Sequence, residues 1–203
     1  MKVLDLFAGL EGWSEPWRED GHDVFSVDWD FQFDVDLHID ILQLSPQMLP
    51  WKPDIILASP PCETFSQLSV RHHWTREHTP KTEKAVLHYK LVDKTLQLVE
   101  DLAPEYGWII ENPRAKLRSM PLMQDLPRQT VWYCRYGMPY AKPTDLFGYV
   151  PGWTPRPGCH NGNPDHIAAP RGSKTGVQGG SMTAAERAKV PYALSREIME
   201  AVS

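Results

Sequence analysis

The chain has 203 residues, a formal net charge of −5, 41% hydrophobic residues and three cysteines. These values are typical of one soluble globular domain and exclude a disulfide-rich scaffold or a strongly basic nucleic-acid coat. The N-terminus lacks a leader-like pattern and no apolar run reaches about eighteen residues, so we expect neither a secretory signal nor a membrane span. The charge is uneven, because residues 1–70 hold three basic and thirteen acidic residues whereas the remainder is net basic.

Short apolar runs alternate with helix-length segments over the first 110 residues. The runs predict strands over residues 2–7, 24–27, 37–40, 54–58 and 107–110. Two prolines end the fourth run at Ser59-Pro60-Pro61, and the fifth is expected to end at Glu111-Asn112-Pro113. Apolar residues at helical spacing predict a helix over residues 83–102. This alternation predicts an α/β fold, a mostly parallel sheet flanked by helices.

The composition changes after residue 140. Residues 142–178 are rich in Gly, Pro, Asn and Thr, which predicts a loop-rich segment, and residues 183–202 predict a final helix. We therefore expect a single domain over residues 1–203. It comprises a cofactor-binding and catalytic core (1–140), a loop-rich part that serves as a reduced target-recognition segment (141–182) and a C-terminal helix (183–203).

Polar residues follow the predicted strands at the points where they end: Gly9, Asp28, Asp40, Cys62 and Glu111. Each has a structural alternative, such as a turn glycine, a helix cap or a buried thiol. Because the carboxyl ends of parallel strands meet at one sheet edge, we expect the five to converge. A glycine turn followed by an acid suits the ribose of an adenosine-like ligand. The phosphate-binding GxGxxG and P-loop patterns are both missing. That combination suits S-adenosyl-L-methionine.

Five motifs in one order resemble those of the DNA cytosine-5 methyltransferases, and they cover residues 1–144. They are Asp5-Leu6-Phe7-Ala8-Gly9-Leu10-Glu11-Gly12, Asp28-Trp29, Asp40-Ile41, Pro60-Pro61-Cys62-Glu63-Thr64-Phe65-Ser66 and Glu111-Asn112-Pro113. The resemblance implies a Rossmann-like methyltransferase fold that uses S-adenosyl-L-methionine on duplex DNA with a flipped cytosine.

By that resemblance, Phe7 packs on the adenine ring, Trp29 flanks it and Asp40 accepts from its amino group. Asp28 binds the ribose, and the glycines admit the methionine part. The cofactor-binding set so implied is Phe7, Ala8, Gly9, Gly12, Asp28, Trp29, Asp40, Ile41 and Pro61.

The reaction that this family catalyses suits the residue types. Cytosine C5 is too weak a nucleophile to accept a methyl group until a thiolate adds to C6, which assigns Cys62. Glu111, as a neutral acid, would donate to cytosine N3. Lys142 and Thr144 stand where the family motif supplies two arginines around the base. We therefore predict Cys62, Glu111 and Lys142 as the catalytic residues, with Lys142 lacking the bidentate fork of arginine.

Only about forty-five residues separate Thr144 from the matching C-terminal motif near Lys189, too few for a large target-recognition region. Specificity is then expected to be short, relaxed or supplied by a partner. Loops carrying basic residues are equally well explained as solvated surface or as phosphate contacts. The predicted nucleic-acid contacts are Ser66, Arg71, Arg76, Arg114, Arg171 and Lys174.

Other interpretations stay open. Ser59-Pro60-Pro61 matches the start of the motif of amino-group methyltransferases acting on cytosine N4 or adenine N6, although Cys62 replaces their aromatic residue. An RNA cytosine-5 methyltransferase and a non-catalytic DNA-binding relative are further alternatives.

No metal site is predicted, because Cys159-His160 and Asp165-His166 crowd together without a second pair at zinc spacing. The odd number of cysteines predicts a reducing compartment, the cytoplasm of a prokaryotic or virus-infected cell. The oligomeric state is left open, with a monomer as the simplest expectation.

Overall fold

The computed structural model describes residues 1–160, 163–164, 166–167 and 183–203. Seven strands in these residues form one sheet in the order β3-β2-β1-β4-β5-β7-β6. All pairings are parallel except those of β7, which runs antiparallel to both β5 and β6. The mostly parallel α/β fold expected from the sequence is confirmed. The strands are β1 (Lys2–Leu6), β2 (Asp23–Asp28), β3 (Leu37–His38), β4 (Ile55–Ala58), β5 (Trp108–Pro113), β6 (Arg128–Trp132) and β7 (Pro143–Tyr149).

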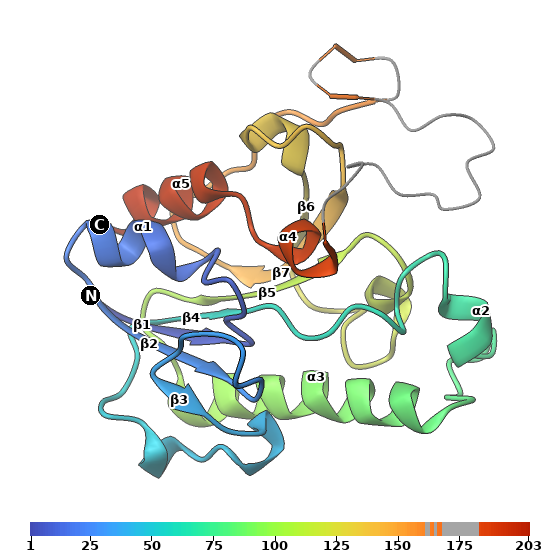
Figure 1. Ribbon diagram of the computed structural model, residues 1–203, viewed down its shortest axis with the longest axis horizontal. Coiled ribbons are helices and arrows are strands. Elements are labelled where there is room, and N and C mark those ends of the chain that lie inside the picture. The colour runs from blue at the N-terminus through green and yellow to red at the C-terminus, as the bar shows by residue number, and fades with distance from the viewer. Residues whose placement is uncertain (161–162, 165, 168–182) are drawn as a thin grey trace.

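Helices cover the sheet on both faces (Figure 1). On one face, α1 (Ser14–Glu19) lies beside α5 (Tyr192–Val202), and on the other lies the long helix α3 (Glu83–Leu102). Of the two short helices, α2 (Val70–His73) stands apart from these layers, whereas α4 (Ala184–Ala188) lies on the side of the sheet that carries α5. Four 3-10 turns complete the described helical residues: η1 (Ile41–Gln43), η2 (Pro46–Met48), η3 (Lys116–Ser119) and η4 (Tyr133–Tyr136).

The central strands are apolar on both faces, because both faces are covered. In β4, Ile55 and Leu57 join the cluster under α1 and α5, whereas Ile56 and Ala58 join the cluster over α3. Successive side chains of a strand point to opposite faces, so a continuous apolar run is what a doubly covered parallel strand requires. This explains why short apolar runs in the sequence predict the central strands correctly.

The helix predicted over residues 83–102 is confirmed residue for residue as α3. Its start is fixed by the Thr82 side chain, which accepts a hydrogen bond from the Ala85 amide, and the left-handed Ala103 ends it. In the part of the chain that the structure describes, no helix is both long and apolar enough to cross a membrane.

The fifth strand is longer than the sequence predicted. Residues 111–113 were expected to end it, but β5 continues through Pro113. The reason is its antiparallel neighbour β7, whose Thr144 pairs with Pro113 and whose Leu146 pairs with Glu111. Glu111 therefore lies within a strand at the interior of the sheet, not in a loop.

The prediction of a loop-rich segment from residue 142 was wrong for its first part. Pro143–Tyr149 is strand β7, buried between β5 and β6. Its sequence carries polar residues, which suggested a loop, but sheet pairing on both sides satisfies its backbone. Strand β6 and helix α1 were not predicted either.

The C-terminal helix predicted over residues 183–202 is two helices. Helix α4 ends before Lys189, whose backbone is not helical (φ −51°, ψ 129°), and Pro191 directly precedes α5. The proline also disfavours helical backbone at Val190, so the two helices stay separate. The third strand is also shorter than predicted, since Asp40 caps the 3-10 turn η1 instead of ending β3.

The Arg118 guanidinium is held against the sheet. It donates to both carboxylate oxygens of Asp145, at 2.9 and 2.6 Å, and Asp145 on β7 is 1% exposed. Arg118 also donates to Thr130 on β6. The basic stretch at residues 114–118 is therefore divided, with Arg118 structural and Arg114 exposed.

We expect Arg118→Met to lower the free energy of unfolding by about 3 kcal/mol, because it leaves the Asp145 carboxylate buried without its cation. Arg114→Met, in an exposed residue of the same stretch, is the matched control and should change stability little. Urea unfolding of the two variants measures the difference. Equal losses in both would contradict a structural role specific to Arg118.

Candidate active site

The ends of β1 and β2 meet through Asp28. Leu6 pairs with Val27, so the turn after β1 lies level with the end of β2. The Gly9 amide donates to Asp28 Oδ2 at 3.0 Å, and the Asp30 amide donates to Oδ1, also at 3.0 Å. Asp28 is 7% exposed, and each of its oxygens keeps a further lone pair. The carboxylate is thus fixed in place while retaining the capacity to accept from a ligand hydroxyl.

The turn after β1 contains left-handed residues. Phe7, Gly9 and Glu11 have φ of 60°, 52° and 51°. Glycine adopts this conformation without strain, whereas for Phe7 and Glu11 it costs on the order of 1 kcal/mol each. Strain of this kind persists where the surroundings fix the backbone, and it concentrates at functional sites.

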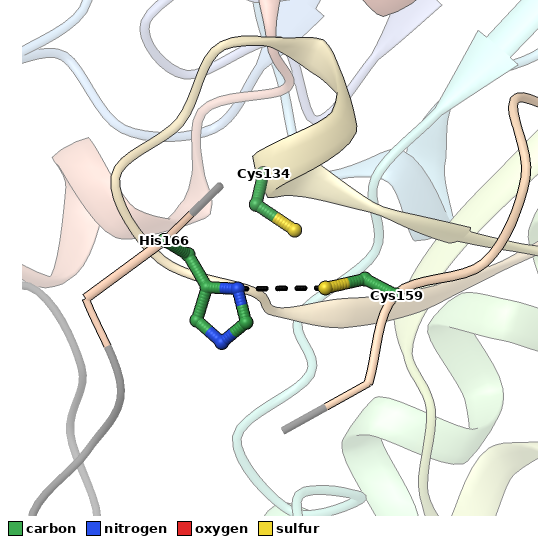
Figure 2. A group of neighbouring side chains, drawn as sticks. All are labelled: Cys134, Cys159 and His166. Carbon is green, nitrogen blue, oxygen red and sulfur yellow. Dashed lines mark hydrogen bonds between the residues drawn. The ribbon is translucent and has the colours of Figure 1, made fainter. Parts of the chain in front are cut away.

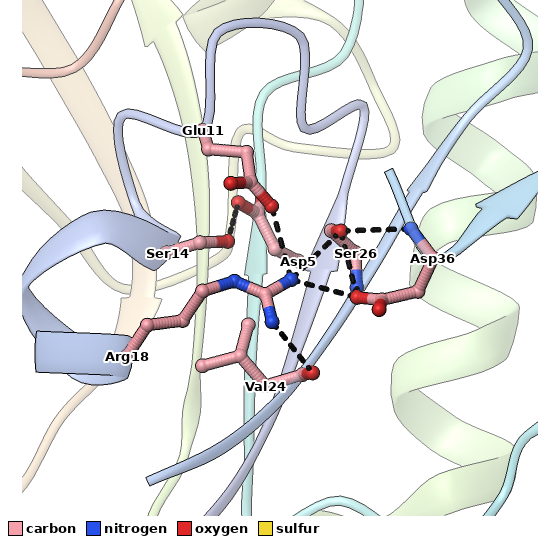
Figure 3. A network of polar contacts seen from close by, with 7 residues as sticks. All are labelled: Asp5, Glu11, Ser14, Arg18, Val24, Ser26 and Asp36. Carbon is pink, nitrogen blue, oxygen red and sulfur yellow. Dashed lines mark hydrogen bonds and ion pairs between the residues drawn. The ribbon is translucent and has the colours of Figure 1, made fainter. Parts of the chain in front are cut away.

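Polar contacts behind this turn fix its position (Figure 3). Arg18 on α1 donates to Glu11 Oε1 at 3.0 Å and to Asp36 Oδ2 at 2.7 Å. Asp36 also accepts from the Ser26 amide and hydroxyl at 2.8 and 2.9 Å. The arrangement ties the first turn, the first helix and the segment after β2 together.

Asp5 is the second-last residue of β1, just before the same turn. It is fully buried and accepts from the Ser14 hydroxyl at 2.6 Å, and burial raises its pKa to about 7. The folded chain therefore keeps this carboxyl partly protonated near pH 7.

The residues expected to surround an adenine ring follow the carboxyl ends of the three adjacent strands β1, β2 and β3. Trp29 is 64% exposed, and Phe7 is half-buried against the core. Asp40 is exposed, and its Oδ1 accepts from the Leu42 amide at 2.9 Å. The Ile41 side chain is buried in the core, so only its backbone could reach a ligand.

Atoms of Lys189 and Val190, in the C-terminal segment, lie directly against Gly12. A Cβ at Gly12 would stand 2.6 Å from the Val190 nitrogen and 2.8 Å from its carbonyl oxygen. The missing side chain is therefore required by the packing of residues 189–190 on the turn. The segment around Lys189, which was expected to complete the cofactor pocket, therefore packs directly on the turn after β1. This contact gives Gly12 a packing role that the sequence did not indicate.

The loop that carries Cys62 is held from three sides. The Asn112 amide donates to the Pro60 carbonyl at 3.1 Å, and the Trp13 indole donates to Ser59 Oγ at 2.9 Å. Thr64 Oγ1 lies 3.1 Å from His88 Nδ1 on α3. Burial lowers the pKa of His88 to about 4, so this imidazole is neutral near pH 7. The loop is therefore anchored to β5, to the first turn and to α3.

Glu111 has two partners in the interior. It is 4% exposed, and its Oε1 accepts from the Tyr133 hydroxyl at 2.8 Å and faces Lys142 Nζ at 3.5 Å. The Lys142 ammonium also lies 4.3 Å from the centre of the Tyr133 ring, within cation–π range. Lys142 has φ of 29°, a left-handed backbone. Tyr133 and Lys142 together fix one carboxylate oxygen.

The pKa of the Cys62 thiol depends on its burial and on the charges of Glu111 and Lys142. Burial raises the pKa of its thiol, the Glu111 carboxylate raises it further and the Lys142 ammonium lowers it. Of the three predicted catalytic residues, Glu111 and Lys142 are in contact, and both lie within electrostatic range of Cys62. In the free protein Cys62 is a protonated thiol near pH 7.

The predicted nucleic-acid contacts are scattered. Arg71, Arg76 and Arg114 are exposed, whereas the Ser66 hydroxyl lies 2.9 Å from Ser69 Oγ within its own loop. Arg71 and Arg76 follow the Cys62 loop in sequence. Arg171 and Lys174 lie outside the described residues.

Sequence reasoning missed two members of the site. Tyr133 lies in a 3-10 turn after β6 and reaches Glu111 only through the tertiary fold, so no local pattern could have found it. His88 could have been suspected, since it is a histidine on the apolar stripe of a predicted helix.

Comparison with known proteins gives a consistent result. Residues 1–112 match the sequence model of the family described as C-5 cytosine-specific DNA methylase. The chain is similar to the "Probable DNA (cytosine-5)-methyltransferase" of Frog virus 3 (isolate Goorha), with 29% identity over 163 residues, which cover 77% of this chain and 74% of the viral protein.

Solved structures share the fold. A prophage-encoded candidate DNA modification methyltransferase of E. coli has a TM-score of 0.54 at 19% identity, covering 74% of this chain and 46% of that one. The Entamoeba histolytica methyltransferase EhMeth has a TM-score of 0.52 at 13% identity, covering 74% and 52%. The chain thus spans about half the length of these structures.

The charge balance at Cys62 can be tested without any substrate. Because Glu111 raises the pKa of the thiol and Lys142 lowers it, we expect Glu111→Gln to speed alkylation of Cys62 by iodoacetamide at pH 8 and Lys142→Met to slow it. Mass spectrometry of the Cys62 peptide gives the rate constants. A shift of both variants in the same direction would indicate altered exposure and contradict the electrostatic account.

Proposed function

The chain belongs to the family of C-5 cytosine-specific DNA methylases, and on this premise we propose that it transfers a methyl group from S-adenosyl-L-methionine to C5 of cytosine in DNA through a covalent adduct on Cys62. The observation that carries the proposal is the juxtaposition of a thiol, a buried carboxylate and an ammonium. Glu111 and Lys142 lie within electrostatic range of Cys62, and Lys142 lies 3.5 Å from Glu111.

The residues at the ends of β1 and β2 fit S-adenosyl-L-methionine. Asp28 is a fixed, nearly buried carboxylate with lone pairs to spare, as ribose hydroxyls need. Trp29 is an exposed aromatic beside it, and Asp40 an exposed acceptor for an amino group. Phe7, Ala8 and Gly9 would line the turn. The cofactor, when bound, supplies an electrophilic methyl group on a sulfonium.

Pro61 and the backbone of Ile41 complete the proposed cofactor contacts. Gly12 contributes indirectly in this proposal, because it lets Val190 close the segment against the turn.

Cys62 is the proposed nucleophile. Its thiol gives its proton to solvent as the cytosine binds, and the sulfur adds to cytosine C6 while the electrons of the C5–C6 double bond move toward C5. With the cytosine in place, Glu111 takes up a proton in this proposal and donates it to N3, which neutralises the charge pushed into the ring. C5 accepts the methyl group, a general base removes the C5 proton, the C6–S bond breaks and N3 returns its proton to Glu111. Cys62 is regenerated as a thiolate.

Lys142 and Tyr133 have supporting roles in this scheme. The Lys142 ammonium stabilises the Cys62 thiolate, and it offsets the negative charge near the ring. Tyr133 donates to Glu111 Oε1 and thereby leaves Oε2 for the base. Lysine supplies the charge of the arginine expected in the family, without a bidentate contact to the base.

The substrate is proposed to be duplex DNA with the target cytosine flipped from the stack, because a stacked base is closed to attack at C6. The exposed Arg71, Arg76 and Arg114 are suited to phosphates. RNA stays the alternative substrate for the same chemistry. The viral relative is consistent with action inside an infected cell.

Methylation at an amino group is less well supported. Ser59 would belong to the motif for that chemistry, but its hydroxyl accepts from the Trp13 indole and the fourth position is Cys62. An amino-group mechanism would also leave the enclosed Glu111 without a role.

We expect Cys62→Ala to reduce methyl transfer to unmethylated genomic DNA by more than about 1000-fold, because no other thiol would reach C6. Binding of S-adenosyl-L-methionine, followed by calorimetry, should stay nearly unchanged. Asp28→Ala is the matched variant with the opposite pattern, weak cofactor binding with the thiol intact. Methyl transfer that survives Cys62→Ala would contradict the proposed mechanism.

A further inference from the structure

A second cysteine cluster lies away from Cys62. Cys134 in η4, Cys159 and His166 place one donor atom each within 4.8 Å of one another (Figure 2). The Cys159 sulfur lies 3.4 Å from His166 Nδ1. The three residues come from two segments that are 25 positions apart in sequence, so only the fold assembles them.

These distances match a metal site. Tetrahedral zinc has Zn–S bonds of about 2.3 Å and Zn–N bonds of about 2.0 Å, which place a sulfur and a nitrogen ligand about 3.5 Å apart and two sulfurs about 3.8 Å apart. The observed sulfur–nitrogen distance lies close to the first value. Two thiols and an imidazole are also donors that zinc prefers over the hard, oxygen-binding cations.

The surroundings hold the two segments together without the cluster. On one side, Arg135 donates to the Gly158 carbonyl at 3.0 Å. On the other, the Ile167 amide donates to the Pro139 carbonyl at 3.0 Å. The cluster is therefore flanked by contacts on both sides, so its donors are preorganised and little chain entropy is lost when a metal binds.

We propose that Cys134, Cys159 and His166 bind Zn²⁺ as a structural site, with a fourth ligand from water or a further side chain. The sequence predicted no metal site, because the donors that lie near one another in the sequence all follow residue 158 and are crowded together. Cys134 supplies the missing donor from η4, which precedes β7 in the sequence, whereas Cys159 and His166 follow β7. Binding releases the protons of both thiols to solvent, so the site carries two thiolates and a neutral imidazole.

The position suggests what the metal would do. Cys134 directly follows Tyr133, whose hydroxyl donates to Glu111. Zinc would fasten the segment after β7 to the turn that positions this tyrosine. The site is thus a clip beside the proposed active site, and it does not depend on the proposed reaction.

The test uses the full chain, stripped of metal by a chelator under reducing conditions and titrated with Zn²⁺ or Co²⁺. We expect one equivalent to bind, and cobalt to show thiolate charge-transfer and tetrahedral visible bands. Cys159→Ser and His166→Ala, both in partly exposed positions, should each weaken zinc affinity by more than about 100-fold, which exceeds the loss typical of second-sphere changes. Circular dichroism confirms that the variants are folded.

Cys62→Ser is the matched control, because it removes a thiol outside the cluster and should keep the metal stoichiometry. Three results would overturn the proposal: a cobalt spectrum without thiolate bands, equal metal binding by Cys159→Ser, or a Cys134–Cys159 disulfide in freshly lysed cells quenched with an alkylating agent. Cys134 is buried, so Cys134→Ser is used only as a third variant if it folds.

Discussion

The parallel register of β1, β2, β4 and β5 is the constraint on which the rest of the site depends. Because Leu6 pairs with both Val27 and Ala58, the turns that follow these strands start at one level of the sheet. Ala58 pairs in turn with Ile110, which brings Glu111 next to the loop that carries Cys62. A slip of one residue in any of these pairings would send side chains to the opposite face. Successive apolar residues of these strands pack into two different clusters, so such a slip would disrupt both. Core packing therefore also fixes the positions of the residues that follow the strands.

A second constraint is electrostatic. The fold buries a carboxylate near a thiol, two groups that would be hard to ionise together. Lys142 Nζ lies 3.5 Å from Glu111 Oε1 and lowers the pKa of the Cys62 thiol, and the Tyr133 hydroxyl donates to the same Glu111 oxygen. The left-handed backbone at Lys142 and the long strand β7 are what bring this cation inward from the segment after β6. Residues outside the motifs around Cys62 and Glu111, namely Tyr133 and Lys142, therefore complete the contacts of the Glu111 carboxylate in the proposed active site.

The sequence predicted the central strands and α3 well because both faces of the sheet are covered, and a covered strand or amphipathic helix leaves a local apolar pattern. It failed where stability comes from neighbours. The polar residues of β7 are typical of a loop. The sequence does not show that β5 and β6 pair with its backbone or that Arg118 pairs with Asp145. The convergence of Cys62 and Glu111 was predictable from strand ends. The roles of Tyr133 and Cys134 were not, since each meets its partners only across the folded sheet.

The central claim is that Cys62 bonds to cytosine C6, and trapping tests it most directly. Duplex DNA in which 5-fluorocytosine replaces cytosine, incubated with the protein and S-adenosyl-L-methionine, should yield a complex that survives denaturation, because fluorine cannot leave C5 as a proton does. Peptide mass spectrometry should locate the link at Cys62. The same experiment with fluorinated RNA separates the two substrates. A methylated exocyclic nitrogen without any trapped complex would contradict the account.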